Sequence, residues 1–496
     1  MYKRRKSSEV SVGNVKIGGE NPIRVQSMAN TSTMDTEGSV AQAIRIVDAG
    51  GEIVRFTTQG QREAQNMQNI KDGLRSAGYS VPLVADVHFN AAVADTAATI
   101  CEKVRINPGN YVDPARTFKS LEYTDEEYAD EIKKIESRFV PFLNICKQHN
   151  TAIRIGVNHG SLSDRIMSRY GDTPEGMVES CMEFLRICVK ENFSNVVISI
   201  KASNTVVMVR TVRLLVSEMA KEGMAFPLHL GVTEAGEGED GRIKSAVGIG
   251  ALLCEGIGDT IRVSLSEAPE KEIPVAQKLV SMIPECAKLR EQAKAAICDD
   301  TVTLSLNETV WEDLQLKAAM TAGVLFIDGL AHKLEIRNAG FPQERLTNLA
   351  DSILQAARVK FVKTDNKEII QEGEHKGKQY SDAYGKKAKK ARSKAKTQPK
   401  ERLHVNVDAD PIEAINRAAD GFRDGQTNNP VNHSAKAVYD ERLNRVETVF
   451  TEAYQDAMVS LKTAQNAIAQ DKDIPDSQNA YMAENLMHGK NKNEQD

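Results

Sequence analysis

The sequence predicts an α/β protein whose largest domain, residues 1–268, is a (β/α)8 TIM-type barrel. Two observations lead to this fold. Over residues 20–265, short β-branched runs alternate regularly with longer stretches of helical period, a pattern that favours a parallel sheet. Eight such strand–helix units in about 250 residues is also the size of a closed barrel.

Eight strands are expected in this domain. An open doubly wound sheet is the alternative arrangement, but no G-x-G-x-x-G motif follows the first strand. The predicted strands are Ile23–Met28, Glu52–Thr58, Pro82–His88, Lys103–Asn107, Ala152–Asn158, Asn195–Lys201, Pro227–Glu234 and Asp259–Leu265.

Composition supports a large aliphatic core. The 496 residues are enough for two or three domains, and a hydrophobic content of 41% with only 5% aromatics suits an α/β interior. No apolar run approaches the length of a membrane span, and the basic N-terminus has no apolar stretch behind it. We therefore expect neither a membrane segment nor a signal peptide. The net charge of −5 favours no particular macromolecular partner.

The cysteines indicate a reducing compartment. None forms a CxxC pair, and their odd number and irregular spacing argue against a disulfide framework and for the cytoplasm. Each is more often a small core residue than a ligand. Cys181 and Cys188 share a helical face two turns apart, which is a packing distance. The seven are Cys101, Cys146, Cys181, Cys188, Cys254, Cys286 and Cys298.

The composition changes after the barrel. Residues 266–300 predict a helix, and residues 301–363 a small α/β unit with GVLFIDGL as a buried strand and LTNLADSILQAARVKF as a helix followed by a strand. Residues 365–402 are lysine-rich and predict a basic, solvated linker. A contact with nucleic acid or another anion is the alternative, but no aromatic residues are interleaved to stack on bases. Residues 403–496 predict a polar tail, largely helical or disordered.

Five of the eight predicted strands carry a cation at or near their C-terminal ends, where active groups of such barrels lie. One buried arginine or lysine is often paired in a structural salt bridge. Five cationic side chains that converge with few carboxylates nearby suggest a bound anion that carries several charges. The planar guanidinium group of arginine is suited to bind the oxygens of such an anion. A metal centre would require more carboxylate or imidazole ligands. The cations are Arg55, Arg105, Arg154, Lys201 and Arg262.

Other polar residues lie at the same strand ends. Glu234 is expected to act as an acid or base, or alternatively as a counter-ion to Arg262 or Lys201. It opens the glycine-rich stretch EAGEGEDGR, whose small residues and following helix suit a phosphate. His88 and His159 are lone histidines, for which a structural role is the commoner one. Further candidates are Asp86, Asn107, Asn158 and Ser264.

Seven motifs in these strand ends occur in an order that resembles the 4-hydroxy-3-methylbut-2-en-1-yl diphosphate synthase family. They are VQSMANTSTMDT, VADVHF, VRINPGN, RIGVNHGSL, KAS, HLGVTEAG and DTIRVSLS. The resemblance covers residues 5–268. A long helical arm in residues 111–150 is similar to the form of the family found in plants and in Bacteroidetes-type bacteria.

The resemblance implies a substrate and a role for each candidate. The family binds 2-C-methyl-D-erythritol 2,4-cyclodiphosphate in the barrel mouth and opens its ring reductively. A 4Fe-4S iron–sulfur cluster in a separate C-terminal domain supplies two electrons from ferredoxin or flavodoxin, and the two domains meet across a homodimer. By resemblance Glu234 would be the acid or base. The diphosphate would be held by Arg55, Arg105, Arg154, Lys201, Arg262 and Ser264, with Asn107 and Asn158 positioning it.

The sequence departs from the family after the barrel. Residues 269–364 resemble a shortened form of the family's α/β insert. Where the cluster domain would begin with a CPxC motif, Asn366, Lys367 and Glu368 follow instead, and no cysteine occurs after Cys298. The tail at 403–496 does not resemble the family. Its last part, NAYMAENLMHGKNKNEQD, is faintly similar to polyvalent proteins of mobile elements.

Three hypotheses remain open from the sequence. The first is an enzyme of this family by descent that is inactive as a single chain, because cluster ligands are not found in it. The second is a barrel that binds the cyclic diphosphate without catalysis, either sensing it or working with a separate cluster-bearing partner. The third is a chain joined by gene fusion, frameshift or assembly, whose tail has no function with the barrel.

Overall fold

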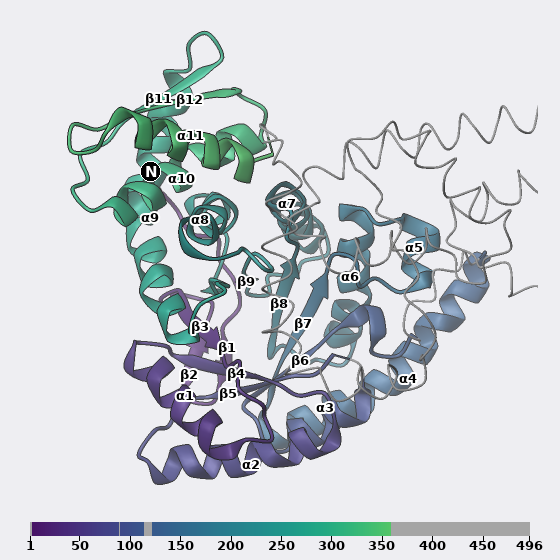
Figure 1. Cartoon of the computed structure of the whole chain (residues 1–496). Helices are drawn as coiled ribbons and strands as arrows, with labels where there is room; N and C mark the ends of the chain where they lie inside the picture. The colour runs from purple at the N-terminus through teal and green to yellow at the C-terminus, as the bar shows by residue number, and fades with distance from the viewer. Residues whose placement is uncertain (1, 89, 114–121, 359–496) are drawn as a thin grey trace, which may run out of the picture. The chain divides into compact units, whose positions relative to one another are not determined.

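The computed structural model describes residues 2–88, 90–113 and 122–358 (Figure 1). These residues belong to one compact unit, Met1–Lys360. The predicted linker at 365–402 and the predicted tail at 403–496 lie outside the described residues. No helix among the residues that are described is both long and apolar enough to cross a bilayer.

Eight parallel strands form a nearly closed barrel, which confirms the predicted fold. Their order in the sheet is β8-β7-β6-β5-β4-β3-β10-β9. The two ends of the sheet meet at one parallel bridge between Ile198 and Leu228. The strands are β3 (Arg24–Met28), β4 (Ile53–Thr57), β5 (Leu83–Asp86), β6 (Lys103–Ile106), β7 (Ala152–Asn158), β8 (Val196–Lys201), β9 (His229–Leu230) and β10 (Thr260–Ile261). Strands β9 and β10 are much shorter than predicted.

Helices surround the barrel and begin at defined caps. Asp35, Asn90, Thr124, Ser163 and Thr173 each accept a hydrogen bond from the backbone N–H of the following first turn, which fixes where a helix starts. The helices are α1 (Thr36–Asp48), α2 (Gln61–Ser76), α3 (Ala91–Ala98), α4 (Asp125–His149), α5 (Asp164–Tyr170), α6 (Pro174–Lys190), α7 (Thr205–Lys221), α8 (Gly238–Cys254) and α9 (Glu272–Ala295), with 3-10 turns η1 (Pro108–Asn110) and η2 (Pro269–Lys271).

A β-hairpin closes the N-terminal end of the barrel. Strands β1 (Val10–Val12) and β2 (Val15–Ile17) pair antiparallel. Their apolar side chains form a separate cluster with the lowest inward-facing residues of four barrel strands, Ile53, Val84, Ala152 and Val197. We call this cluster the apolar plug. The sequence analysis predicts no strand before Ile23, so the hairpin is an addition to the prediction.

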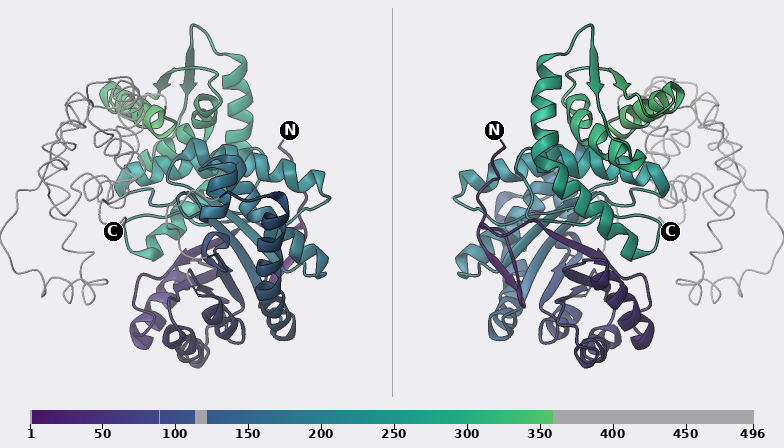
Figure 2. Two further views of the ribbon diagram at one scale, coloured as in Figure 1. Left: turned by 90° about the vertical axis from the view of Figure 1, so that its right-hand side faces the viewer. Right: turned by 90° about the vertical axis from the view of Figure 1, so that its left-hand side faces the viewer.

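The chain after the barrel forms a small α/β unit, green in Figure 2. A parallel pair, β11 (Thr301–Ser305) and β12 (Lys333–Arg337), is joined through α10 (Trp311–Ile327), and α11 (Gln343–Ala356) follows. Helix α10 packs against α8, α9 and α11. Helices α9 and α11 confirm the predicted helices.

The strand predicted at GVLFIDGL is wrong. Its residues 323–327 are the last part of α10, and residues 328–330 form the turn after it. The physical reason is that α10 is buried on nearly all sides, from Leu314 to Ile327, so it has no polar face. A short apolar run of this kind cannot be distinguished from a buried strand by its periodicity.

Candidate functional site

Four predicted cations enter the interior of the barrel from neighbouring strands. Arg55, Arg105, Arg154 and Lys201 lie on β4, β6, β7 and β8, and all are buried. Arg262 follows β10 and is half-buried. The structure thus brings four of the predicted cations into the barrel interior, with Lys201 at the C-terminal end of its strand. We call these five residues the cation ring.

Three arginines of the cation ring share one carboxylate. Asp86 Oδ2 lies 3.3 Å from Arg55 Nε, and its Oδ1 lies 3.3 Å from Arg105 Nη1 and 3.5 Å from Arg154 Nη2. Burial by itself would raise the pKa of Asp86, but the charges of Arg55 and Arg105 outweigh it and hold this pKa well below its usual range. Asp86 is therefore an anion that compensates several cations at once.

The cation ring has more positive charge than its surroundings neutralise. Among the described residues, Lys201 has no carboxylate at ion-pair distance; burial and the charges of Arg55 and Arg154 lower its pKa well below the usual value. Burial also lowers the pKa of Arg55 to about 10. Ionised groups that repel one another in a low dielectric are stabilised by a bound anion. The cation ring therefore favours the binding of an anion.

Some N–H groups of the cation ring point toward the sulfur atom of Met28. Arg55 Nη2 lies 2.7 Å and its Nε 3.0 Å from Met28 Sδ, while Arg262 Nη1 lies 3.8 Å from the same atom. A thioether is a weak acceptor. Phosphate oxygens in its place would bind these N–H groups much more strongly.

Arg262 has its own counter-ion, which sequence reasoning missed. Its Nη2 and Nε lie 3.1 and 3.2 Å from the two carboxylate oxygens of Glu272, the first residue of α9. Ser27 Oγ donates to Glu272 at 2.6 Å. The alternative role of Glu234 as counter-ion is not seen, because within the described residues it forms no ion pair with Arg262 or Lys201.

Glu234 lies exposed in the loop between β9 and α8. Its φ of 49° is in the left-handed region, which is uncommon for a residue with a side chain. Partial desolvation raises the pKa of Glu234, although the charge of Lys244 opposes this. A carboxyl group with a raised pKa at the rim is suited to deliver or take a proton.

A glycine creates the space for Arg105. A Cβ on Gly156 of β7 would lie 2.6 Å from Arg105 Nε, and the Gly156 carbonyl accepts a hydrogen bond from Arg105 Nη2 at 3.0 Å. The arginine therefore lies directly across β7. Any larger residue at Gly156 would push the guanidinium away from Asp86.

The remaining candidates lie around the cation ring. His88 Nε2 lies 3.4 Å from Asp86 Oδ2, so His88 belongs to the same network. Asn107 is buried, and its Oδ1 accepts from the Gly109 N–H at 3.3 Å. Asn158 pairs in register with Lys201, and Ser264 is half-buried two residues beyond Arg262. His159, in contrast, faces Asp172, with its Nε2 3.5 Å from Oδ1.

Further interior residues were not predicted. Arg154 Nη1 donates to Ser199 Oγ at 3.3 Å, and Lys103 and His229 are fully buried below the cation ring. A signal for Lys103 was present, since it precedes Arg105 by two residues in the same strand and so shares its face. His229 and Ser199 stand in the same relation to Gly231 and Lys201.

The cysteines do not fit an iron–sulfur cluster. All seven lie within the described residues; six are buried and only Cys298 is exposed. Burial raises the pKa of Cys254 to about 12 and of Cys286 to about 11, which favours thiols over the thiolates that ligate iron. No group of three histidine, cysteine or acidic side chains suited to a metal occurs in the described ranges. The described residues thus do not provide the cluster ligands that the resemblance implies.

The small α/β unit contacts the N-terminal part of α8. Trp311 Nε1 donates to Glu239 Oε1 at 2.8 Å, and the Arg345 guanidinium lies 3.8 Å from the centroid of the Trp311 ring. Arg242 Nε, one turn into α8, lies 2.9 Å from Glu312 Oε2 at the start of α10. These contacts hold the first turn of α8, next to the Glu234 loop.

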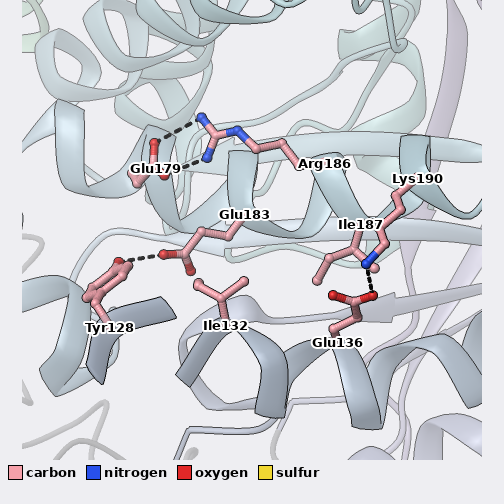
Figure 3. Close-up of a pocket in the computed structure, with 8 residues that line it drawn as sticks. All are labelled: Tyr128, Ile132, Glu136, Glu179, Glu183, Arg186, Ile187 and Lys190. Atoms are coloured by element: carbon pink, nitrogen blue, oxygen red, sulfur yellow. Dashed lines mark hydrogen bonds and ion pairs between the residues drawn. The ribbon is translucent and has the colours of Figure 1, made fainter. Parts of the chain in front are cut away.

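A groove between α4 and α6 lies outside the barrel interior (Figure 3). Tyr128 OH donates to Glu183 across it, and ion pairs join Lys190 to Glu136. Glu183 also accepts from Arg165 of α5 at 2.7 and 2.8 Å. Because its charged groups are paired with one another, we interpret the groove as a structural junction of α4, α5 and α6.

The match to a family model decides the relationship of this chain. The GcpE TIM-barrel domain matches residues 7–277. The chain belongs to the GcpE family. This finding confirms the resemblance seen in the strand-end motifs, and the matched range contains every residue of the cation ring.

Curated relatives of the GcpE family carry the name 4-hydroxy-3-methylbut-2-en-1-yl diphosphate synthase. The Bacteroides thetaiotaomicron protein, named with flavodoxin, is 79% identical over 282 residues, which cover 57% of this chain and 46% of that protein. The Phocaeicola vulgatus protein is 78% identical with the same coverage. The chloroplastic protein of Arabidopsis thaliana, named with ferredoxin, is 54% identical over 288 residues, covering 58% of this chain and 39% of that one. The chain spans about half the length of the curated relatives it matches.

Proposed function

We propose that the barrel binds 2-C-methyl-D-erythritol 2,4-cyclodiphosphate among the residues of the cation ring. The observation that carries the proposal is three buried arginines sharing the single carboxylate of Asp86, beside a buried lysine with no ion-pair partner in the described structure. A ligand with two negative phosphates supplies the missing charge. The names of the relatives, which act in making 4-hydroxy-3-methylbut-2-en-1-yl diphosphate, support this ligand.

Each residue of the site has a role that follows from its chemistry. The forks of Arg55, Arg105 and Arg154 bind phosphate oxygens in pairs, and Lys201 adds a compact charge. Arg262, held by Glu272, and Ser264 bind from the β10 side. Asn107 and Asn158 position the ligand, and Asp86 with His88 orients Arg105. Glu234 is the acid or base at the rim.

We propose further that the chain completes the family reaction only with a cluster-bearing partner. Opening the ring requires two electrons, and the described residues do not fit the iron–sulfur cluster that would deliver them. Ferredoxin or flavodoxin, which the relatives' names contain, would be the electron donor. A barrel that binds without catalysis is the alternative. A homodimer, the cytoplasm as location and the absence of a nucleic-acid partner stay predictions from the sequence.

Calorimetric titration with the cyclic diphosphate tests the binding site. Arg154→Ala should weaken binding by about 1.5–3 kcal/mol, the usual loss of a hydrogen bond to a charged group. Arg186→Ala, an exposed arginine on α6 that pairs with Glu179 and Glu222, is the control and should bind as the wild type does. Unchanged affinity in both Arg154→Ala and Arg262→Ala would remove the cation ring from the site.

Turnover with an added cluster domain separates the enzyme from the binding protein. After anaerobic reconstitution, the purified chain should hold no stoichiometric iron or sulfide, and with a reductant it should form no linear diphosphate. Addition of a cluster domain in trans should then restore turnover if the chain is an enzyme, and should not if it only binds. About four irons per chain, or product formed by the chain alone, would contradict the proposed dependence on a partner.

A further inference from the structure

Two basic side chains lie in the layer directly beneath the cation ring. Lys103 is two residues before Arg105 on β6 and therefore faces the same interior, one layer deeper. His229 on β9 likewise precedes Gly231 by two residues. A Cβ added at Gly231 would lie 3.3 Å from Lys201 Nζ, so Gly231 lies at the level of the cation ring. Lys103 is 0% and His229 1% exposed. Lys103 pairs in register with Val84 and Ala152 of the apolar plug, so it is flanked by apolar side chains.

The nitrogen atoms of this layer have no partners in the described part of the chain. Lys103 Nζ and both ring nitrogens of His229 are buried without a hydrogen bond, as are the Nε atoms of Arg105 and Arg154 just above. Buried polar groups are almost always hydrogen-bonded, and exceptions are frequently functional. Five such atoms in two adjacent layers indicate a binding site whose ligand lies in the cation ring.

The charges facing this layer are almost all positive. Those acting on Lys103 are Arg154 and Arg55, and those acting on His229 are Lys201, Arg154, Arg55 and Lys103. Asp86, two residues beyond Val84 on the neighbouring strand, is already shared by three arginines. Burial first, and these cations second, lower the pKa of both Lys103 and His229 well below their usual values, so both burial and charge oppose a proton on either side chain.

We propose that Lys103 and His229 form a proton-accepting floor of the anion site, which takes up a proton when a diphosphate binds in the cation ring above. The proposal rests on the proposed function, since it takes that diphosphate as the ligand. The anion cancels the repulsion from Arg55 and Arg154. A proton from solvent then converts the Lys103 amine to an ammonium group, while the imidazole of His229 remains neutral in the same layer.

The sign of the pH dependence follows from linkage. A group whose pKa is higher in the bound than in the free protein binds a proton together with the ligand. Affinity should therefore rise as pH falls through the window between the two pKa values. The cyclic diphosphate does not titrate there, because each of its phosphorus atoms carries only one strongly acidic oxygen. Any proton taken up then belongs to the protein.

Calorimetry of the full chain with the cyclic diphosphate, in two buffers of different ionisation enthalpy, tests the proposal. The wild type should take up as much as about one proton per ligand. Lys103→Met should lose most of this uptake and bind more weakly. Without ligand, the same variant should melt at a higher temperature, because an unpaired buried amine has been removed. A merely structural residue would not change binding and stability in opposite directions.

Lys317→Met is the matched control. Lys317 is also buried, but it pairs with Glu285 at 2.8 Å and with Glu308. This variant should melt at a lower temperature and keep both affinity and proton uptake. If Lys103→Met fails to fold, Lys103→Gln and the pH dependence of wild-type affinity give the same information.

The outcomes distinguish this inference from the proposed function. Binding by the wild type without proton uptake would overturn the proton-accepting floor and leave the diphosphate site intact. Uptake that persists in Lys103→Met would place the proton on another group, such as Lys201 or His229, and would overturn its assignment to Lys103. No binding of the cyclic diphosphate by the wild type would sink the proposed function, and the inference with it.

Discussion

Two buried arginines of this protein, Arg165 and Arg154, are in opposite electrostatic situations. Their side chains are 4% and 3% exposed. Arg165 forms two hydrogen bonds of 2.7 and 2.8 Å to Glu183 and lies 3.2 Å from Asp113. Within the described ranges, Arg154 has a 3.5 Å contact to Asp86, which it shares, and a 3.3 Å hydrogen bond to Ser199.

The pKa values of the two guanidinium groups shift in opposite directions. Burial lowers both, but the hydrogen bonds and charge of Glu183 more than offset it, so the pKa of Arg165 is raised. For Arg154, burial and the charge of Arg55 together lower the pKa well below its usual value. The two arginines are equally buried, but only Arg165 has its charge neutralised by carboxylates. Arg165 therefore joins α4, α5 and α6, whereas Arg154 remains available to bind a ligand.

Removal of Arg165 should have the largest effect. Arg165→Met leaves the carboxylates of Glu183 and Asp113 buried without compensation, so the free energy of unfolding should fall by about 3–5 kcal/mol. Urea denaturation measures it. Arg154→Met is the matched variant, and it should lose little stability or gain some, because it removes a repelled charge. Equal losses in the two variants would show that the comparison has no functional meaning.

Ligand should stabilise only the chain with an intact cation ring. At about 100 times its dissociation constant, the cyclic diphosphate should add about 2.7 kcal/mol to the free energy of unfolding of the wild type. At that same concentration Arg154→Met should gain much less. Thermal melts with and without ligand provide the measurement. If the ligand stabilises Arg154→Met as much as the wild type, Arg154 does not bind the ligand and the contrast with Arg165 fails.

Gly156→Ala should affect the ring without changing any charge. The new methyl group would lie 2.6 Å from Arg105 Nε, and overpacking of this kind costs about 1–3 kcal/mol. We expect a loss of stability together with weaker binding, because Arg105 must move from Asp86. Normal ligand affinity in Gly156→Ala would show that Arg105 does not contact the diphosphate.

The smallest effect is expected at an exposed arginine. The Arg345 side chain is 47% exposed, lies over Trp311 and pairs with Glu239 at 3.4 Å. Arg345→Ala should reduce the free energy of unfolding by only about 0.5–1 kcal/mol, the range for an exposed cation–π contact. The same denaturation series measures it. A loss as large as that of Arg165→Met would mean that exposure is a poor guide to the role of an arginine in this protein.

The cation ring was predictable because each charge interrupts a strand that is otherwise β-branched. Such a position is unfavourable unless the side chain faces a site, and the two-residue period places Arg105 and Asn107 on one face. The partners of the ring were not predictable in the same way. Glu272 lies at the start of a helix beyond the last barrel strand, and nothing local connects it to Arg262. Lys103 was visible in the sequence but was taken only as the start of a strand.

The fold shows the same division between local and distant signals. The seven- and six-residue strands β7 and β8 were predicted closely, because their apolar runs are long enough to be recognised. The three-residue strands of the N-terminal hairpin give almost no periodic signal. Helix α10 was mistaken in part for a strand, because its burial depends on α8 and α9, which pack against it. A local sequence pattern does not reveal tertiary contacts of that kind.

The apolar plug closes the N-terminal end of the barrel with apolar side chains. Positive charge at its top is surrounded by low-dielectric walls and floor, so its field leaves mainly through the mouth and is focused there. An approaching anion would be steered inward although the whole chain carries a net charge of −5. The rate of capture should therefore fall steeply as salt is added, while the rate of escape, set by close contacts, should change little.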